Sequence, residues 1–268
     1  MDTIRQGFII RILRQNWSGH SSNEVGLISK MAHSIHSPQL AAALLSAAAA
    51  AESIRTAVFL ELAAFASGRK PALRLVIDSN DVPALLSAVN DFDHIDTAVR
   101  SISISSISNS WGEISSSTCN TPHALLVLDH FGSASELLDA ELSDSYASGL
   151  RLGYPPCCVA ALGTHRSNPG AWPLQLLNGL GEGTSVDHRV NRFCAEWGGI
   201  GLLGELFPCS VHCPAAKDYA DGLLHSAVSL GLNRLADIAV KHAKTSVYIS
   251  SDGEINLHGK PHELVDFY

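Results

Sequence analysis

A run of five apolar residues, Ala124-Leu125-Leu126-Val127-Leu128, is typical of a buried β-strand. Leu73-Arg74-Leu75-Val76-Ile77 predicts a second strand, and the alternation of isoleucine and serine within residues 100–108 predicts a third. Helices are expected over residues 82–90 and from a serine cap at 133 or 135 to about residue 150. This β-α-β-β-α order predicts a small sheet with flanking helices, which is a mixed α/β (α+β) fold.

The first 70 residues are expected to be helical. Apolar side chains recur at helical spacing from Pro38 to Ala66, and Gly68 is expected to end that helix. The segment from Ala41 to Ala51 is rich in alanine, the strongest helix former. Together with the aromatic content of only 6%, it suggests a helix-mediated homodimer.

The C-terminal part is expected to be mainly helical, with glycine, proline and cysteine between its helices. The expected elements are helices over 155–163, 187–206, 214–231 and 233–244, and a hairpin of residues 245–249 and 254–257 that turns at Asp252-Gly253. We therefore expect two domains. Residues 1–150 form a helical plus small α/β domain, and residues 151–268 form a mainly helical cysteine-site domain with the C-terminal hairpin.

The composition of the 268-residue chain excludes several classes of protein. The formal net charge is −8, from 18 basic and 26 acidic residues, so the chain lacks the charge balance of a nucleic-acid-binding protein. It contains no run of 18 apolar residues, which argues against a membrane span. Its N-terminal segment lacks the uninterrupted apolar stretch of a secretory signal, so we expect a cytoplasmic protein.

Cysteine usage indicates metal binding or thiol chemistry. In a reducing compartment, a chain of this size has little use for structural disulfides. The six cysteines are Cys119, Cys157, Cys158, Cys194, Cys209 and Cys213. We interpret Cys119 and Cys194 as ordinary core or loop residues, with Cys194 as a spare ligand.

The other four cysteines lie in two short segments that each precede or begin a helix. In Leu152-Gly153-Tyr154-Pro155-Pro156-Cys157-Cys158, the prolines suit a first helical turn, and Gly153 can close the preceding helix in a left-handed conformation. In Phe207-Pro208-Cys209-Ser210-Val211-His212-Cys213-Pro214, Cys213 is expected at the cap of a helix that Pro214 begins. Helix N-termini stabilise thiolates, so two converging N-termini would form a site for a metal or cluster.

A set of four cysteine ligands suits a zinc ion and a [4Fe–4S] cluster equally well, and the candidates are Cys157, Cys158, Cys209 and Cys213. Adjacent cysteines on a helix are expected to point in different directions, which favours the larger cluster over a single zinc ion. A cysteine followed directly by proline, as at Cys213, also ends the cluster-binding run of ferredoxins. We therefore expect a [4Fe–4S] cluster on these four cysteines, with zinc as the alternative.

Other interpretations of the same four residues remain open. They could form a zinc-stabilised binding module without catalysis, or Cys157 or Cys158 could be the nucleophile of a thiol-dependent enzyme. They could also be buried core cysteines without a ligand, since a free cysteine behaves as a small apolar residue.

The two segments resemble the paired motifs of a family of uncharacterised microbial proteins. That family combines Gly-Tyr-Pro-x-Cys-Cys, here residues 153–158, with a later Pro-Cys-Ser-x-x-Cys, here residues 208–213. The resemblance covers residues 145–230 and departs at the second motif, where three residues rather than two separate Cys209 from Cys213. Because of this departure, His212 could replace Cys213 as a ligand. The resemblance implies a cysteine site and names no reaction.

A polar segment between the motifs, residues 187–192, could line a pocket. Arg189 and Arg192 could then bind a carboxylate or phosphate, while His188 or His212 transfers a proton. The alternative is a solvated helix start that Asp187 caps.

Together, the four cysteines and the candidate pocket residues predict an iron–sulfur enzyme of small-molecule (secondary or amino-acid-like) metabolism, with a small-molecule substrate or an electron-transfer partner.

Overall fold

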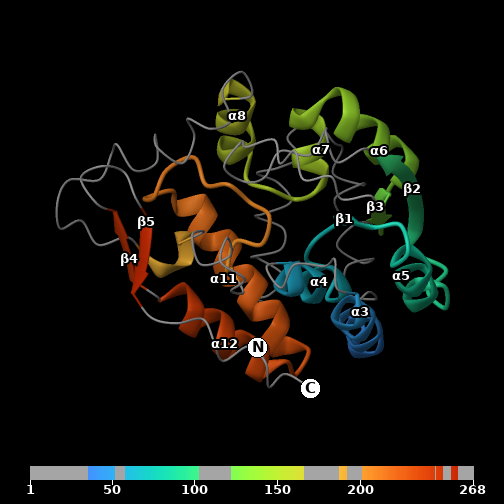
Figure 1. Ribbon diagram of the computed structural model, residues 1–268, viewed down its shortest axis with the longest axis horizontal. Helices are drawn as coiled ribbons and strands as arrows, with labels where there is room; N and C mark the ends of the chain where they lie inside the picture. Colours follow the sequence, from blue (N-terminus) through green and yellow to red (C-terminus); the bar gives the residue numbers. More distant parts are fainter. Residues whose placement is uncertain are drawn as a thin grey trace, which may run out of the picture.

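The computed structural model describes residues 36–51, 58–102, 122–165, 187–191, 201–244, 246–249 and 255–258. In these residues, helices pack against a three-stranded antiparallel sheet that lies at one side of the molecule, which confirms the expected mixed α/β (α+β) class (Figure 1). The strands are β1 (Ala72–Asp78), β2 (Asp96–Ile102) and β3 (His123–Asp129), with β4 (Ser246–Ile249) and β5 (Ile255–His258) as a separate pair. The helices are α3 (Pro38–Ala50), α4 (Phe59–Ala66), α5 (Val82–Val89), α6 (Ala134–Ser143), α7 (Ser145–Arg151), α8 (Pro156–His165), α11 (Pro214–Ser229) and α12 (Asn233–Ala243).

Strand β3 is the centre of the three-stranded sheet, whose order is β1-β3-β2. Leu126 of β3 pairs in register with Leu75 of β1 and with Val99 of β2. Successive side chains of a strand point to opposite faces, so a continuous apolar run requires both faces to be covered. Two separate groups of apolar residues meet this requirement.

The larger apolar core contains Leu126 and Leu128 from one face of β3, together with residues of α3, α4, α5, α11 and α12. The smaller core contains Leu125 and Val127 from the opposite face, packed against α6 and Leu152 at the end of α7. Cys158 and Cys213 belong to the larger core, so that core brings the two cysteine-bearing segments together.

Several expected helix boundaries differ from the structure. The expected helix over 133–150 is interrupted, because the carboxylate of Asp144 accepts the amide hydrogen bonds of Tyr146 and Ala147 and begins α7. The helix expected over 187–206 is wrong where residues are described: His188–Val190 is one 3₁₀ turn and residues 202–205 form turns. The segment from Pro38 to Ala66 contains two helices, α3 and α4.

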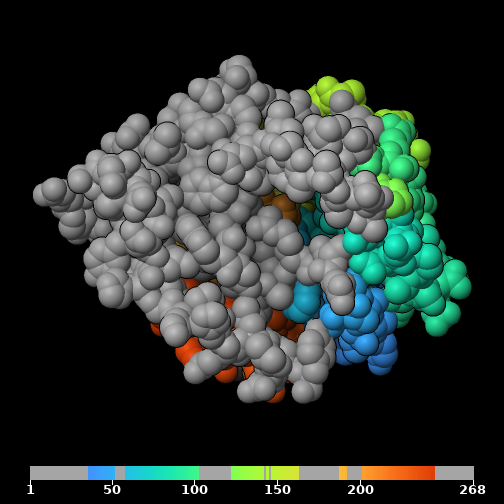
Figure 2. Space-filling view, viewed as in Figure 1, coloured from blue at the N-terminus to red at the C-terminus, as the bar shows by residue number. Residues whose placement is uncertain are grey.

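Helix α3 is the alanine-rich segment on which the homodimer prediction depends. Its buried residues, which include Leu40 and Leu44, pack into the larger core. On the face shown in Figure 2, α3 (blue) lies at the surface beside the green and cyan residues around the sheet and α5. A homodimer through this helix stays a prediction.

The C-terminal hairpin is present as expected, with β4 and β5 antiparallel. Its turn, Asp252-Gly253, lies outside the described residues, as do residues 1–35. The division into two domains at residue 150 stays a prediction. Helix α4, from the first expected domain, packs directly against α11, from the second. Among the described helices, none has both the length and the apolar character that crossing a bilayer requires.

Candidate metal centre

The first cysteine pair lies in the first turn of α8, as expected. Gly153 adopts a left-handed conformation (φ 80°) after α7, and a Cβ there would lie 2.9 Å from the Cδ atom of Pro71. The chain then enters α8 at Pro156, where a missing amide hydrogen costs no hydrogen bond. Cys157 and Cys158 follow directly, so their side chains project from the N-terminal end of the helix.

The second pair lies where the chain enters α11. Cys213 is the N-cap residue of α11, and Pro214 occupies the first helical position, which confirms both expectations. The Sγ atom of Cys213 accepts a hydrogen bond from the amide of Ala216 at 3.4 Å. A side chain that caps a helix in this way has little rotational freedom, so α11 fixes the position of this sulfur.

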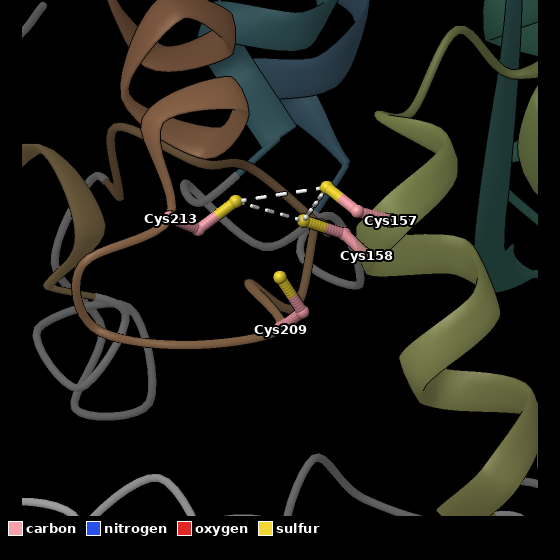
Figure 3. Close-up of side chains that lie close together, drawn as sticks. All are labelled: Cys157, Cys158, Cys209 and Cys213. Atoms are coloured by element: carbon pink, nitrogen blue, oxygen red, sulfur yellow. Dashed lines mark hydrogen bonds between the residues drawn. The ribbon is translucent and has the colours of Figure 1, made fainter.

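All four sulfur atoms converge on one point (Figure 3). The Sγ atom of Cys213 lies 3.7 Å from that of Cys157 and 3.7 Å from that of Cys158. Cys209 completes the group, in which all four ligand atoms lie within 4.8 Å of one another. Four cysteines so arranged could hold a metal ion.

The expectation that Cys157 and Cys158 point in different directions is wrong. Their Sγ atoms are 3.9 Å apart. Successive Cα atoms are only about 3.8 Å apart. Rotation about the two Cα–Cβ bonds at the start of a helix is therefore enough to direct both sulfurs to one side.

Burial and hydrogen bonding act differently on the four thiols. Burial raises the pKa of Cys158 far above its ordinary value, although the backbone amide of Cys209 opposes the shift. Burial and the neighbouring Cys213 thiol raise the pKa of Cys209 to about 12. Burial also opposes ionisation of Cys213, but hydrogen bonds from the Ala216 amide and from the other thiols hold its pKa below the ordinary value. Cys157 is the exposed member of the group.

A polar cluster of two buried residues, Glu61 and Lys70, and two half-buried residues, Tyr154 and Tyr219, was not foreseen from the sequence. The side chains of Glu61 and Lys70 are each 1% exposed, and their charged atoms are 3.6 Å apart. The ammonium group of Lys70 lies 4.1 Å from the ring centroid of Tyr154 and donates to the Leu152 carbonyl at 2.9 Å. Glu61 is the one charged residue in α4, an otherwise apolar helix. A lone charge in an apolar helix indicates a buried, paired side chain, so the sequence did contain a signal for this cluster.

The described part of the polar segment, residues 187–191, forms a capped turn, and substrate binding by Arg189 and Arg192 stays a prediction. Asp187 accepts the amide hydrogen bond of Arg189 and caps the 3₁₀ helix. The guanidinium of Arg189 is held by Asp187 at 2.7 Å and by Asp221 at 2.8 Å, so its charge is already paired. This pairing holds the pKa of Asp187 well below its usual range. His188 lies 3.7 Å from the same carboxylate.

The remaining sequence candidates lie apart from the sulfur atoms or outside the described residues. His212 is exposed and is not among the grouped ligand atoms, whereas Cys213 is. His188 and His212 as proton-transfer groups stay predictions. Arg192, Cys119 and Cys194 lie outside the described residues.

Gly204 allows the backbone to approach Glu61 closely. Its φ is 56°, and a Cβ at this position would overlap the side chain of Glu61. Gly204→Ala is therefore expected to lower the free energy of unfolding by about 2–5 kcal/mol, from left-handed strain and overpacking combined. Urea denaturation followed by circular dichroism measures this loss.

Gly231→Ala is the matched control for Gly204→Ala. Gly231 has a φ of 80°, but a Cβ there would meet nothing within 4 Å. Only the conformational cost of about 1–2 kcal/mol is expected. Equal losses in the two variants would show that contact with Glu61 does not matter.

Comparison of the chain with protein-family models, with curated proteins and with solved structures found no match.

Proposed function

We propose that Cys157, Cys158, Cys209 and Cys213 bind one zinc ion, which joins the start of α8 to the start of α11. The spacing of the sulfur atoms carries this proposal. Zn–S bonds of about 2.3 Å in a tetrahedron place the sulfur atoms about 3.8 Å apart. The three pairs among Cys157, Cys158 and Cys213, at 3.7, 3.7 and 3.9 Å, agree with that value.

A [4Fe–4S] cluster in an enzyme of small-molecule metabolism is the second candidate. The Cys213-Pro214 pair, which resembles the end of a ferredoxin motif, favours it. In a cubane each thiolate binds a different iron, so the four sulfurs must stand farther apart than they do around a single ion. The spacing therefore supports zinc over the cluster, because the cluster would require both segments to move outward.

The donor set suggests what the ion does. Four protein thiolates fill a tetrahedral zinc site, whereas catalytic zinc keeps one position open for water or substrate. The proposed role is therefore structural: the ion closes a chain segment that begins in α8 and ends at α11, and so stabilises a non-catalytic module. The resemblance to the family with paired cysteine motifs also supports a cysteine site.

The thiol-enzyme alternative receives less support from the geometry. A reactive cysteine needs a lowered pKa and access to solvent. Cys158 is 1% exposed and its pKa is raised, so Cys158 fits a ligand better than a nucleophile. Cys157 is exposed, and rapid alkylation of this thiol alone in zinc-loaded protein would favour the enzyme instead.

Elemental analysis of protein purified without oxygen and without added metal tests the proposal. We expect a colourless protein with about one zinc ion per chain. Cobalt substituted for zinc should give the intense visible bands of a tetrahedral thiolate site. Iron with acid-labile sulfide would establish the second candidate, and protein that contains neither metal and does not bind cobalt would overturn both.

A further inference from the structure

We propose that Glu61 is the positioning residue of the metal centre, which it controls without contacting the ion. One oxygen of its carboxylate, Oε1, accepts hydrogen bonds from three different parts of the chain. The donors are the Tyr219 hydroxyl at 3.0 Å, the Glu205 amide at 3.1 Å and the Tyr154 hydroxyl at 3.4 Å. The inference rests on the proposed metal binding.

Each donor belongs to a segment that carries a cysteine of the centre. Tyr154 precedes Cys157 by three residues, in the same motif. Glu205 precedes Cys209 by four residues. Tyr219 lies in α11, the helix that Cys213 caps. A single atom of α4 therefore connects all the segments that supply the four sulfurs.

The environment of Glu61 makes these connections rigid. Burial, followed by the charge of Glu61, raises the pKa of both tyrosines well above the ordinary value, so their hydroxyls remain protonated donors. Lys70 balances the carboxylate charge and donates to the Tyr219 hydroxyl at 3.2 Å. A buried polar network in which each member has partners holds one geometry, because any other arrangement leaves a buried polar group unpaired.

This rigidity has a consequence for metal affinity. An ion that binds four thiols from separate segments must supply the free energy to order those segments, unless the protein has already ordered them. Because the Glu61 connections form within the protein, they reduce that cost. Residues that orient metal ligands without touching the metal typically change affinity by about 10- to 100-fold.

The test measures cobalt affinity, by competition with a chelator, in full-length wild-type protein and in two variants. Glu61→Gln removes the charge that aligns the three donors, and we expect cobalt binding to weaken by roughly 10- to 100-fold, with weaker tetrahedral cobalt bands. Tyr219→Phe removes the shortest of the three hydrogen bonds and should weaken binding by about tenfold. If Glu61→Gln does not fold, Tyr219→Phe alone decides the question.

Asp129→Asn is the matched control, because Asp129 is also a buried carboxylate with several donors. It is 4% exposed and accepts hydrogen bonds from the amides of Phe131 and Gly132 and from Arg151. None of these donors lies in the cysteine motifs or in α11. This variant is expected to lose stability while it keeps the cobalt affinity and spectrum of the wild type.

The outcomes separate this inference from the proposed function. If wild-type protein does not bind cobalt, the metal proposal and the role of Glu61 both fail. If wild-type protein binds cobalt and folded Tyr219→Phe or Glu61→Gln binds it with unchanged affinity, only the role of Glu61 is overturned. Equal weakening in Asp129→Asn would also overturn it, because general loss of stability would then explain the effect.

Discussion

Replacement of Cys158 by serine is expected to abolish stoichiometric zinc binding and to lower the free energy of unfolding by several kcal/mol. Cys158 is 1% exposed, and its sulfur lies 3.7 Å from that of Cys213. The apparent binding free energy of structural zinc in zinc-finger peptides is about 10–16 kcal/mol. Because zinc binds the folded chain, the lost binding free energy appears as lost stability. Metal analysis and urea denaturation measure the two effects.

Two comparisons isolate the contribution of the metal in this experiment. Cys119→Ser changes a cysteine outside the proposed ligand set and should leave the zinc content unchanged. In chelator-treated protein, the wild type and Cys158→Ser should differ much less in stability than they do with zinc present, because only side-chain packing then distinguishes them. A Cys158→Ser protein that retains one zinc per chain would contradict the proposed ligand set.

Lys70→Met is expected to lower the free energy of unfolding by about 3–5 kcal/mol, because it leaves the charge of Glu61 buried without its cation. Burial lowers the pKa of Lys70, but the adjacent Glu61 carboxylate opposes that shift and favours the charged amine. Methionine retains the apolar stem and loses the bonds to the Leu152 carbonyl and the Tyr219 hydroxyl. Urea denaturation followed by circular dichroism measures the loss.

Arg100→Met is the control for Lys70→Met. Arg100 forms a shorter ion pair, 2.7 Å, with Asp139, but the two side chains are 45% and 63% exposed. An exposed pair is screened by water and is worth about 0–1 kcal/mol, so the change should be small. Similar losses in the two variants would contradict the view that burial gives the Glu61–Lys70 pair its importance.

Local signals predicted most of the elements that carry the centre. Pro156 and Pro214 mark the starts of α8 and α11, and Gly153 marks the end of α7, because each acts through the dihedral angles or amide groups of its nearest neighbours. The break at Asp144 is a local signal of the same kind. It was missed because the apolar spacing continues through it, while a capping side chain interrupts the helix.

One premise of the sequence-based preference for a [4Fe–4S] cluster was wrong, while the identity of the metal stays a prediction. The preference depended on the angle between Cys157 and Cys158, and side-chain rotation, which a helical position does not determine, brings their sulfurs to 3.9 Å. The sequence likewise showed Glu61 as a lone charge in an apolar helix, but it could not show which residues would surround that charge.

Residue types and their short-range spacing were therefore sufficient for β1, β3, the starts of α8 and α11 and the four candidate cysteines, whereas the strand expected within 100–108 is described only as β2, Asp96–Ile102. Folding decided the distances between sulfurs that lie more than fifty positions apart, and the convergence of Tyr154, Glu205 and Tyr219 on one carboxylate oxygen. The physical reason is that a cap or a turn depends on a few adjacent dihedral angles. A metal site and a buried ion pair depend on how whole segments pack around a shared core, and no single segment encodes that packing.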